Sequence, residues 1–213
     1  MTRALLLAAA AVTALSLGAC NKRTTEGNTA AANTSAANTA AAPGQTGPVN
    51  AAQNALGAAV GETSAATVGA RDTDAFVKSA VIGNMFEIDA AKIAQEKSSS
   101  ADVKAFAKTM ITDHTALLKE LKPVIAKAGK TAPTELDERR KGLLDNLRAA
   151  GPNDFDKTYL DQQVAGHEEM LTLLKGYAEH GDNADLKAAA TKATPKVQAH
   201  LDKAKALQAK LGG

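Results

Sequence analysis

Four ionisable side chains of types that bind metal ions lie on predicted apolar helix faces of this 213-residue sequence. Each interrupts a run of apolar residues that recur every three or four positions, and such a run predicts the buried face of a helix. A buried polar group without a partner costs a few kcal/mol, so these groups need partners inside the fold. The four residues are Glu87, His114, His167 and His200.

The same four side chains are expected to meet at one level of a helical bundle. Each lies within about three residues of the middle of its predicted helix, which is roughly 5 Å along the helix axis. The middles of bundled helices lie at one level whether neighbours run parallel or antiparallel. The sequence therefore predicts one central polar layer.

Two arrangements would satisfy this layer. In the first, three neutral imidazoles and the Glu87 carboxylate bind one zinc, copper, iron or manganese ion. In the second, Glu87 hydrogen-bonds one protonated histidine and the others pair with Gln163, Tyr159 or water, which fixes the register of the helices. Asp113 and Glu168 lie about 100° around the helix from their neighbouring histidines. They are expected to support a ligand or to contact a neighbouring helix, rather than to bind the ion.

Five helices are predicted to position these residues. Apolar periodicity and turn signals place them at about 73–96, 99–128, 134–150, 154–179 and 182–211. Ser99 with Asp102 is typical of a capping box at the start of the second helix, and Pro195 is expected to kink the last. No alternating β-branched run appears. The prediction is an all-α four-helix bundle, with a short crossover helix between the second and third long helices.

The N-terminal segment has the layout of an export signal. A basic start is followed by an apolar run from Ala4 to Leu17, which is too short to span a bilayer as a mature helix. The run ends in Leu17-Gly18-Ala19-Cys20, which resembles the bacterial lipoprotein signal. The resemblance implies cleavage after residue 19 and acylation of Cys20, which would anchor the chain in a lipid bilayer. Asn21 follows instead of the aspartate of inner-membrane retention, and this favours the outer membrane, facing the periplasm.

Composition divides the rest of the chain into a tether and one domain. Residues 20–71 are mostly Ala, Thr, Asn, Gly and Ser, a composition that predicts a disordered tether, while residues 72–213 carry the bundle. The net charge of +2 and the 3% aromatic content argue against a nucleic-acid partner. Because Cys20 is the only cysteine, the bundle has no disulfide and depends on its apolar core.

Residues from Phe76 to Leu207 resemble the bacterial family known as domain of unknown function 4142, which is grouped with ferritin-like proteins. The matching pieces are Phe86-Glu87, Phe106-Ala107, Met110, Asp113-His114, Phe155-Asp156, Tyr159, His167, Pro195 and His200-Leu201. The resemblance implies a ferritin-like crossover bundle in an exported, often lipid-anchored envelope protein, and it implies no activity. A di-iron centre needs Glu-x-x-His on two helices. The residues three before the histidines are Ile111, Val164 and Val197, so no di-iron centre is expected.

Three functions are consistent with these features. The first is a non-catalytic envelope protein that binds an unspecified partner or supports stress tolerance. The second is a mononuclear metal-binding protein or metalloenzyme that uses the central layer. The third is a carrier of a small ligand with a pocket near Pro195. No nucleophile–base pair or phosphate-binding loop points to an enzyme.

Overall fold

The computed structural model describes residues 47–211, and within that range the chain is helical, with no strand. The predicted signal peptide and Cys20 lie outside the described residues. The helices are α1 (Gly47–Ser64), the π-helix η1 (Ala65–Gly69), α2 (Thr73–Lys97), α3 (Ala101–Lys127), α4 (Glu138–Ala149), α5 (Phe155–His180) and α6 (Ala184–Leu211). The predicted all-α fold class is confirmed, and each of the five predicted helices is present.

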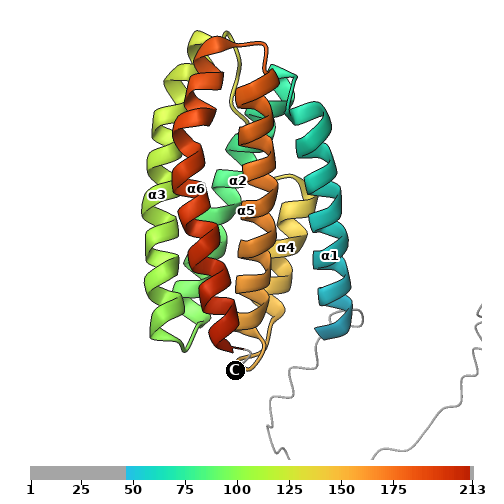
Figure 1. Ribbon diagram of the computed structural model, residues 1–213. Coiled ribbons are helices and arrows are strands. Elements are labelled where there is room, and N and C mark those ends of the chain that lie inside the picture. The colour runs from blue at the N-terminus through green and yellow to red at the C-terminus, as the bar shows by residue number, and fades with distance from the viewer. Residues whose placement is uncertain (1–46, 212–213) are drawn as a thin grey trace, which may run out of the picture. The chain divides into compact units, whose positions relative to one another are not determined.

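Helices α2, α3, α5 and α6 form the four-helix bundle (Figure 1). Helix α2 packs along α3, and α5 packs along α6, so the bundle is built from two helical hairpins. Helix α4 and the loop before it carry the chain back along the bundle, so that α5 runs in the same direction as α3. The short helix between the second and third long helices is therefore a crossover, as predicted.

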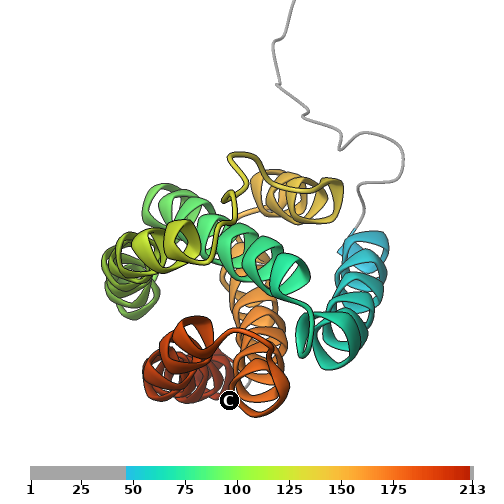
Figure 2. The same cartoon turned by 90° about the horizontal axis from the view of Figure 1, so that it is seen from above.

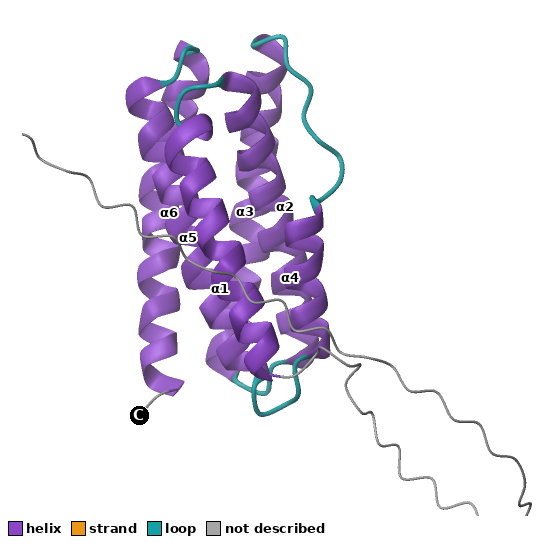
Figure 3. Ribbon diagram, turned by 90° about the vertical axis from the view of Figure 1, so that its right-hand side faces the viewer, coloured by secondary structure: helices purple, strands orange, loops and turns teal. Residues whose placement is uncertain are grey.

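The second half of the predicted tether differs from expectation. Residues 47–69 form α1 and η1, and α1 packs against α5 and α4 on the outside of the bundle (Figures 2 and 3). The Arg139 guanidinium donates to the Gly57 carbonyl oxygen at 2.8 Å, and Asn54 Oδ1 accepts from Gln162 Nε2 at 3.2 Å. These residues belong to the folded unit, because backbone and side-chain hydrogen bonds tie them to α4 and α5.

Local capping marks the starts of α2, α3 and α4. Asp72 and Asp137 each accept a hydrogen bond from the backbone N–H three residues later, as N-cap residues do. The cap of α3 is Ser100, whose side chain accepts from Val103 N, so the predicted cap at Ser99 was one residue early. Helix α6 continues without interruption through Pro195.

The apolar core is divided into two clusters along the bundle. One includes Phe106, Phe155 and Tyr159, and the other includes Phe76 and Tyr177, whose rings stack with centroids 3.9 Å apart. The buried polar residues of the bundle centre belong to neither cluster. Among the described residues, no helix has the length and hydropathy needed to cross a membrane.

Candidate metal centre

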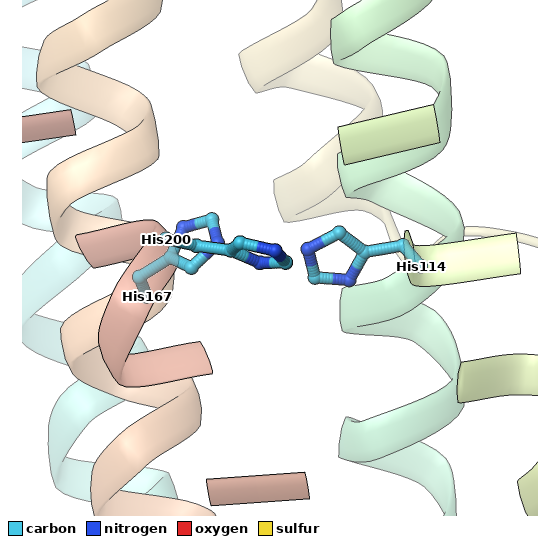
Figure 4. Close-up of side chains that lie close together, drawn as sticks. All are labelled: His114, His167 and His200. Carbon is cyan, nitrogen blue, oxygen red and sulfur yellow. The ribbon is translucent and has the colours of Figure 1, made fainter. Parts of the chain in front are cut away.

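Three histidines from three helices meet at the centre of the bundle. His114 is the middle residue of α3, His167 lies at the middle of α5, and His200 lies slightly past the middle of α6. One ring nitrogen of each lies within 4.8 Å of the others, and all three side chains are buried. Figure 4 shows the rings of His167 and His200 approaching from one side and that of His114 from the other. The prediction that the histidines share one level is confirmed.

Each of these histidines uses one ring nitrogen in a hydrogen bond. His114 Nδ1 lies 2.9 Å from Asn84 Oδ1, His167 Nδ1 lies 2.7 Å from the Gln163 carbonyl oxygen, and His200 Nε2 lies 2.9 Å from Asp113 Oδ2. All three partners accept, so each of these nitrogens carries the proton. The other nitrogens (His114 Nε2, His167 Nε2 and His200 Nδ1) are buried and have no hydrogen-bond partner among the described residues. A neutral imidazole held in this way presents a lone pair at its free nitrogen.

The separations of the rings match the size of a metal ion. The three centroid distances are 5.5, 5.2 and 5.5 Å. Three points at such separations lie about 3.1 Å from their common centre, and a ring nitrogen lies about 1.1 Å from its own centroid, which leaves about 2.0 Å, the length of a zinc–imidazole bond.

Burial also keeps these imidazoles in the form that binds metals. Burial lowers the pKa of His114 well below its usual value and lowers that of His167 to about 4. Burial lowers the pKa of His200 as well, although the hydrogen bond to Asp113 opposes this. The three rings are therefore neutral at pH 7, and no proton has to be displaced before a cation binds.

Glu87 lies beside the histidine cluster and not within it, contrary to the prediction that it is a ligand. Its Oε1 is 3.8 Å from His167 Nδ1, the nitrogen that faces away from the cluster, and its Oε2 accepts from Gln163 Nε2 at 2.6 Å. Burial raises the pKa of Glu87 to about 8. At pH 7 both Glu87 and His167 are neutral, so the contact between them is not an ion pair.

The predicted supporting residues have different outcomes. Asp113 accepts a hydrogen bond from His200. Burial raises the pKa of Asp113, but the hydrogen bonds from Lys196 and His200 lower it by more, so the pKa is lowered overall. Gln163 contacts both His167 and Glu87. Tyr159 is buried, and its hydroxyl has no hydrogen-bond partner among the described residues. Glu168 does not support a histidine of the cluster, because it is exposed. It pairs with Lys205 of α6 at 2.7 Å, which agrees with the alternative prediction of a contact with a neighbouring helix.

Asn84, which orients His114, was not predicted. It is buried on α2, its Nδ2 donates to the Ala80 carbonyl oxygen, and its Oδ1 accepts from His114. Its spacing of three residues before Glu87 was the available signal, because residues three apart lie on one helix face.

A cavity of about 210 Å³ reaches the cluster from the side covered by α1 and α4. Its walls include His114, His167, Glu87 and Gln162. A second, mainly apolar cavity of about 540 Å³ lies near Pro195 between α3 and α6, and its walls include Ala193 and Val197 but none of the three histidines.

Fold and site together define an all-α crossover bundle with a buried cluster of three neutral histidines. The chain belongs to the family described as Domain of unknown function (DUF4142), which matches residues 58–207. The match includes the last turns of α1 and nearly all of the bundle, and it confirms the predicted family. No curated protein and no solved structure matches the chain.

Proposed function

We propose that this protein binds one transition-metal ion through His114, His167 and His200. The observation that carries the proposal is the convergence of three buried histidines with ring nitrogens within 4.8 Å of one another, each of which has one nitrogen in a hydrogen bond and one without a partner among the described residues. Three neutral nitrogen donors favour zinc or copper over manganese, which prefers oxygen ligands. Without Glu87 as a ligand, the geometry also gives no support to a di-iron centre.

The alternative, a polar layer that only fixes the register of the helices, is supported less well. Such a layer would pair its buried groups with one another, because each unpaired group costs about 1–3 kcal/mol. Here each histidine of the cluster keeps one buried nitrogen without a partner, while Asn84, the Gln163 carbonyl and Asp113 are engaged by the other nitrogens. A cation at the centre of the cluster would satisfy all three nitrogens at once.

Metal analysis tests this proposal directly. The full chain would be purified in detergent without chelator or polyhistidine tag, and its metal content measured before and after reconstitution. We expect roughly one ion per chain, and loss of binding in His114→Ala but not in His180→Ala, a control at an exposed histidine. Less than about a tenth of an equivalent of every transition metal after reconstitution would contradict the proposal.

We also propose that the bundle acts at a membrane surface in the cell envelope, held by lipid on Cys20 and facing the periplasm from the outer membrane. The support is the run Leu17-Gly18-Ala19-Cys20 after a short apolar segment. Replacing Cys20 by Ser is expected to move the protein from the membrane fraction to the soluble fraction. Equal membrane association of Cys20→Ser and the unchanged chain would argue against lipid anchoring.

A further inference from the structure

The cavity beside the histidine cluster has a position and a lining that suit a ligand of the metal ion. Three protein ligands leave a tetrahedral ion with one open position, which is the arrangement of catalytic rather than structural zinc sites. The nearby carboxylate of Glu87 approaches the far side of His167 and does not fill that position. The cavity reaches His114 and His167, the residues that hold two of the three free nitrogens.

A hollow between α3 and α6 also reaches the cluster, since its walls include His200. Apolar clusters of the core lie on both sides of the polar layer along the bundle. On the side of α3 and α6, Asp113 accepts from both His200 and Lys196, so this hydrogen-bonded group covers the outer edge of His200. The hollow between α3 and α6 thus leads to the hydrogen-bonded edge of His200, whereas the cavity under α1 and α4 leads to His114 and His167.

The lining of the cavity restricts the charge and size of a ligand. The charged groups of the wall are already paired: Arg139 and Arg140 with the buried Glu169 carboxylate at 2.8 Å, and Asp161 with Lys157 at 2.7 Å. Because the pKa of Glu87 is about 8, that carboxyl is neutral at pH 7, and the wall offers no unpaired charge to an ion. Gln162 is buried in the wall, and its Oε1 has no hydrogen-bond partner among the described residues, so it can accept from a ligand. A cavity of roughly 150 Å³ holds benzene, and this one is of comparable size at about 210 Å³.

We infer that the cavity between α1, α2, α4 and α5 binds a small uncharged molecule, which coordinates the metal ion through one lone pair and donates one hydrogen bond. This inference rests on the proposed metal site. The enclosed volume excludes polymers and large anions as ligands. The metal ion then binds a small molecule in addition to connecting the helices that carry the three histidines.

Imidazole at pH 7.5 is a suitable probe, because both it and Glu87 are mostly uncharged there, and because it is smaller than benzene and has one lone pair and one N–H. The full chain would be loaded with Cu²⁺ or Co²⁺, and imidazole binding followed by the visible spectrum of the ion. Ala58→Phe fills the cavity from α1, and Ala165→Leu fills it from α5. Ala59→Phe is the matched control, because it adds the same ring at the adjacent, exposed position.

We expect imidazole to bind the unchanged protein and Ala59→Phe alike, and to bind each cavity-filling variant at least about tenfold more weakly, with the metal content unchanged. If Ala58→Phe disturbs α1, as circular dichroism would show, Ala165→Leu carries the test. Equal imidazole affinity in all four proteins would overturn the inference, because the ligand would then enter elsewhere. Failure of imidazole to perturb the fully loaded unchanged protein would overturn it too, while leaving the metal site itself intact. Absence of bound metal would instead refute the proposed function.

Discussion

At each histidine of the cluster, the hydrogen bond made by one ring nitrogen fixes the tautomer and so determines what the other nitrogen can do. Asn84 and Asp113 perform this task with side chains, whereas His167 uses the backbone carbonyl of Gln163. The first two can be removed by mutation and the third cannot. The cluster therefore offers two substitutions that alter ligand orientation without deleting a ligand.

Replacing Asn84 or Asp113 by Ala should weaken metal affinity by about 10–100-fold, because the freed imidazole can change tautomer and rotate. Competition with a chromophoric chelator would measure the affinity. Glu168→Ala is the control, since Glu168 is exposed and forms its ion pair on the surface with Lys205. Equal affinities in all three variants would show that these hydrogen bonds do not orient the ligands.

Glu87 should make the metal-free protein less stable as the pH rises. Its pKa is about 8 in the folded protein and 4.5 in a solvated carboxyl, so between these values the unfolded chain binds fewer protons than the folded one. The free energy of unfolding then falls with rising pH. The three histidines have lowered pKa values, so they reduce the free energy of unfolding only below about pH 6.5, where they become protonated in the unfolded chain. Above that pH, the expected change comes from Glu87.

Between pH 6.5 and 8 the expected loss is about 2 kcal/mol in the unchanged protein. Glu87→Gln, which cannot ionise and can keep the contact with Gln163, should show little of this loss. Urea unfolding in the presence of a chelator at the two pH values measures both. A parallel decline in the two proteins would mean that another group is responsible.

The sequence predicted the histidine cluster because helical periodicity specifies which face each residue occupies and at what height. It could not predict where the Glu87 carboxyl points, because the face of a helix does not determine a side-chain rotamer. Glu87 lies in the expected layer but turns to Gln163 and to the outer edge of His167. The role of Asn84 was not predicted for a related reason, because a single amide on an apolar helix face does not indicate which residue of α3 it contacts.

At the scale of elements, α1 shows what apolar periodicity misses. The contact face of α1 and η1 includes small residues four apart (Gly57 and Gly61 in α1, Ala65 and Gly69 in η1), so no bulky residue marks it. A Cβ atom at Gly61 would lie 2.0 Å from Glu169 Oε2, and one at Gly69 would lie 2.5 Å from Leu173 Cδ1. Small residues at this spacing let α1 approach α5 closely, and they were the available signal that residues 47–69 belong to the fold.

Helix α4 is attached to α5 by a buried ion-pair network. Glu169 accepts hydrogen bonds from Arg139 and Arg140, and the side chains of Arg140 and Glu169 are only 9% and 11% exposed. Glu169→Gln should therefore lower the free energy of unfolding by up to about 3–5 kcal/mol, because Arg139 and Arg140 would lose the carboxylate they share, although Arg140 would keep its ion pair with Asp137 at 2.9 Å.

Chemical denaturation would measure this loss, with Asp145→Asn as the control. Asp145 pairs with Arg148 where both side chains are more than half exposed, and such a pair contributes at most about 1 kcal/mol. Similar losses in the two variants would indicate that the buried network is not what holds α4 in place.

For the molecule as a whole, the cluster joins the two halves of the bundle. His114 belongs to the hairpin of α2 and α3, whereas His167 and His200 belong to the hairpin of α5 and α6. A bound ion would thus connect the hairpins at mid-height, at the level where the polar layer interrupts the apolar core. Metal binding should consequently stabilise both hairpins together, and not one hairpin alone.

The expected gain in the free energy of unfolding is about 4 kcal/mol at a thousand-fold excess of metal over its dissociation constant. Hydrogen exchange would show slower exchange in α3 and in α5 and α6 upon metal addition, because opening of either hairpin would break the site. His114→Ala should abolish this protection in both hairpins, although the substituted residue lies in only one of them, whereas the exposed His180→Ala should keep it. Protection that persists in α5 and α6 of His114→Ala would mean that the ion is bound within one hairpin, and that the three-helix site does not connect the halves of the bundle.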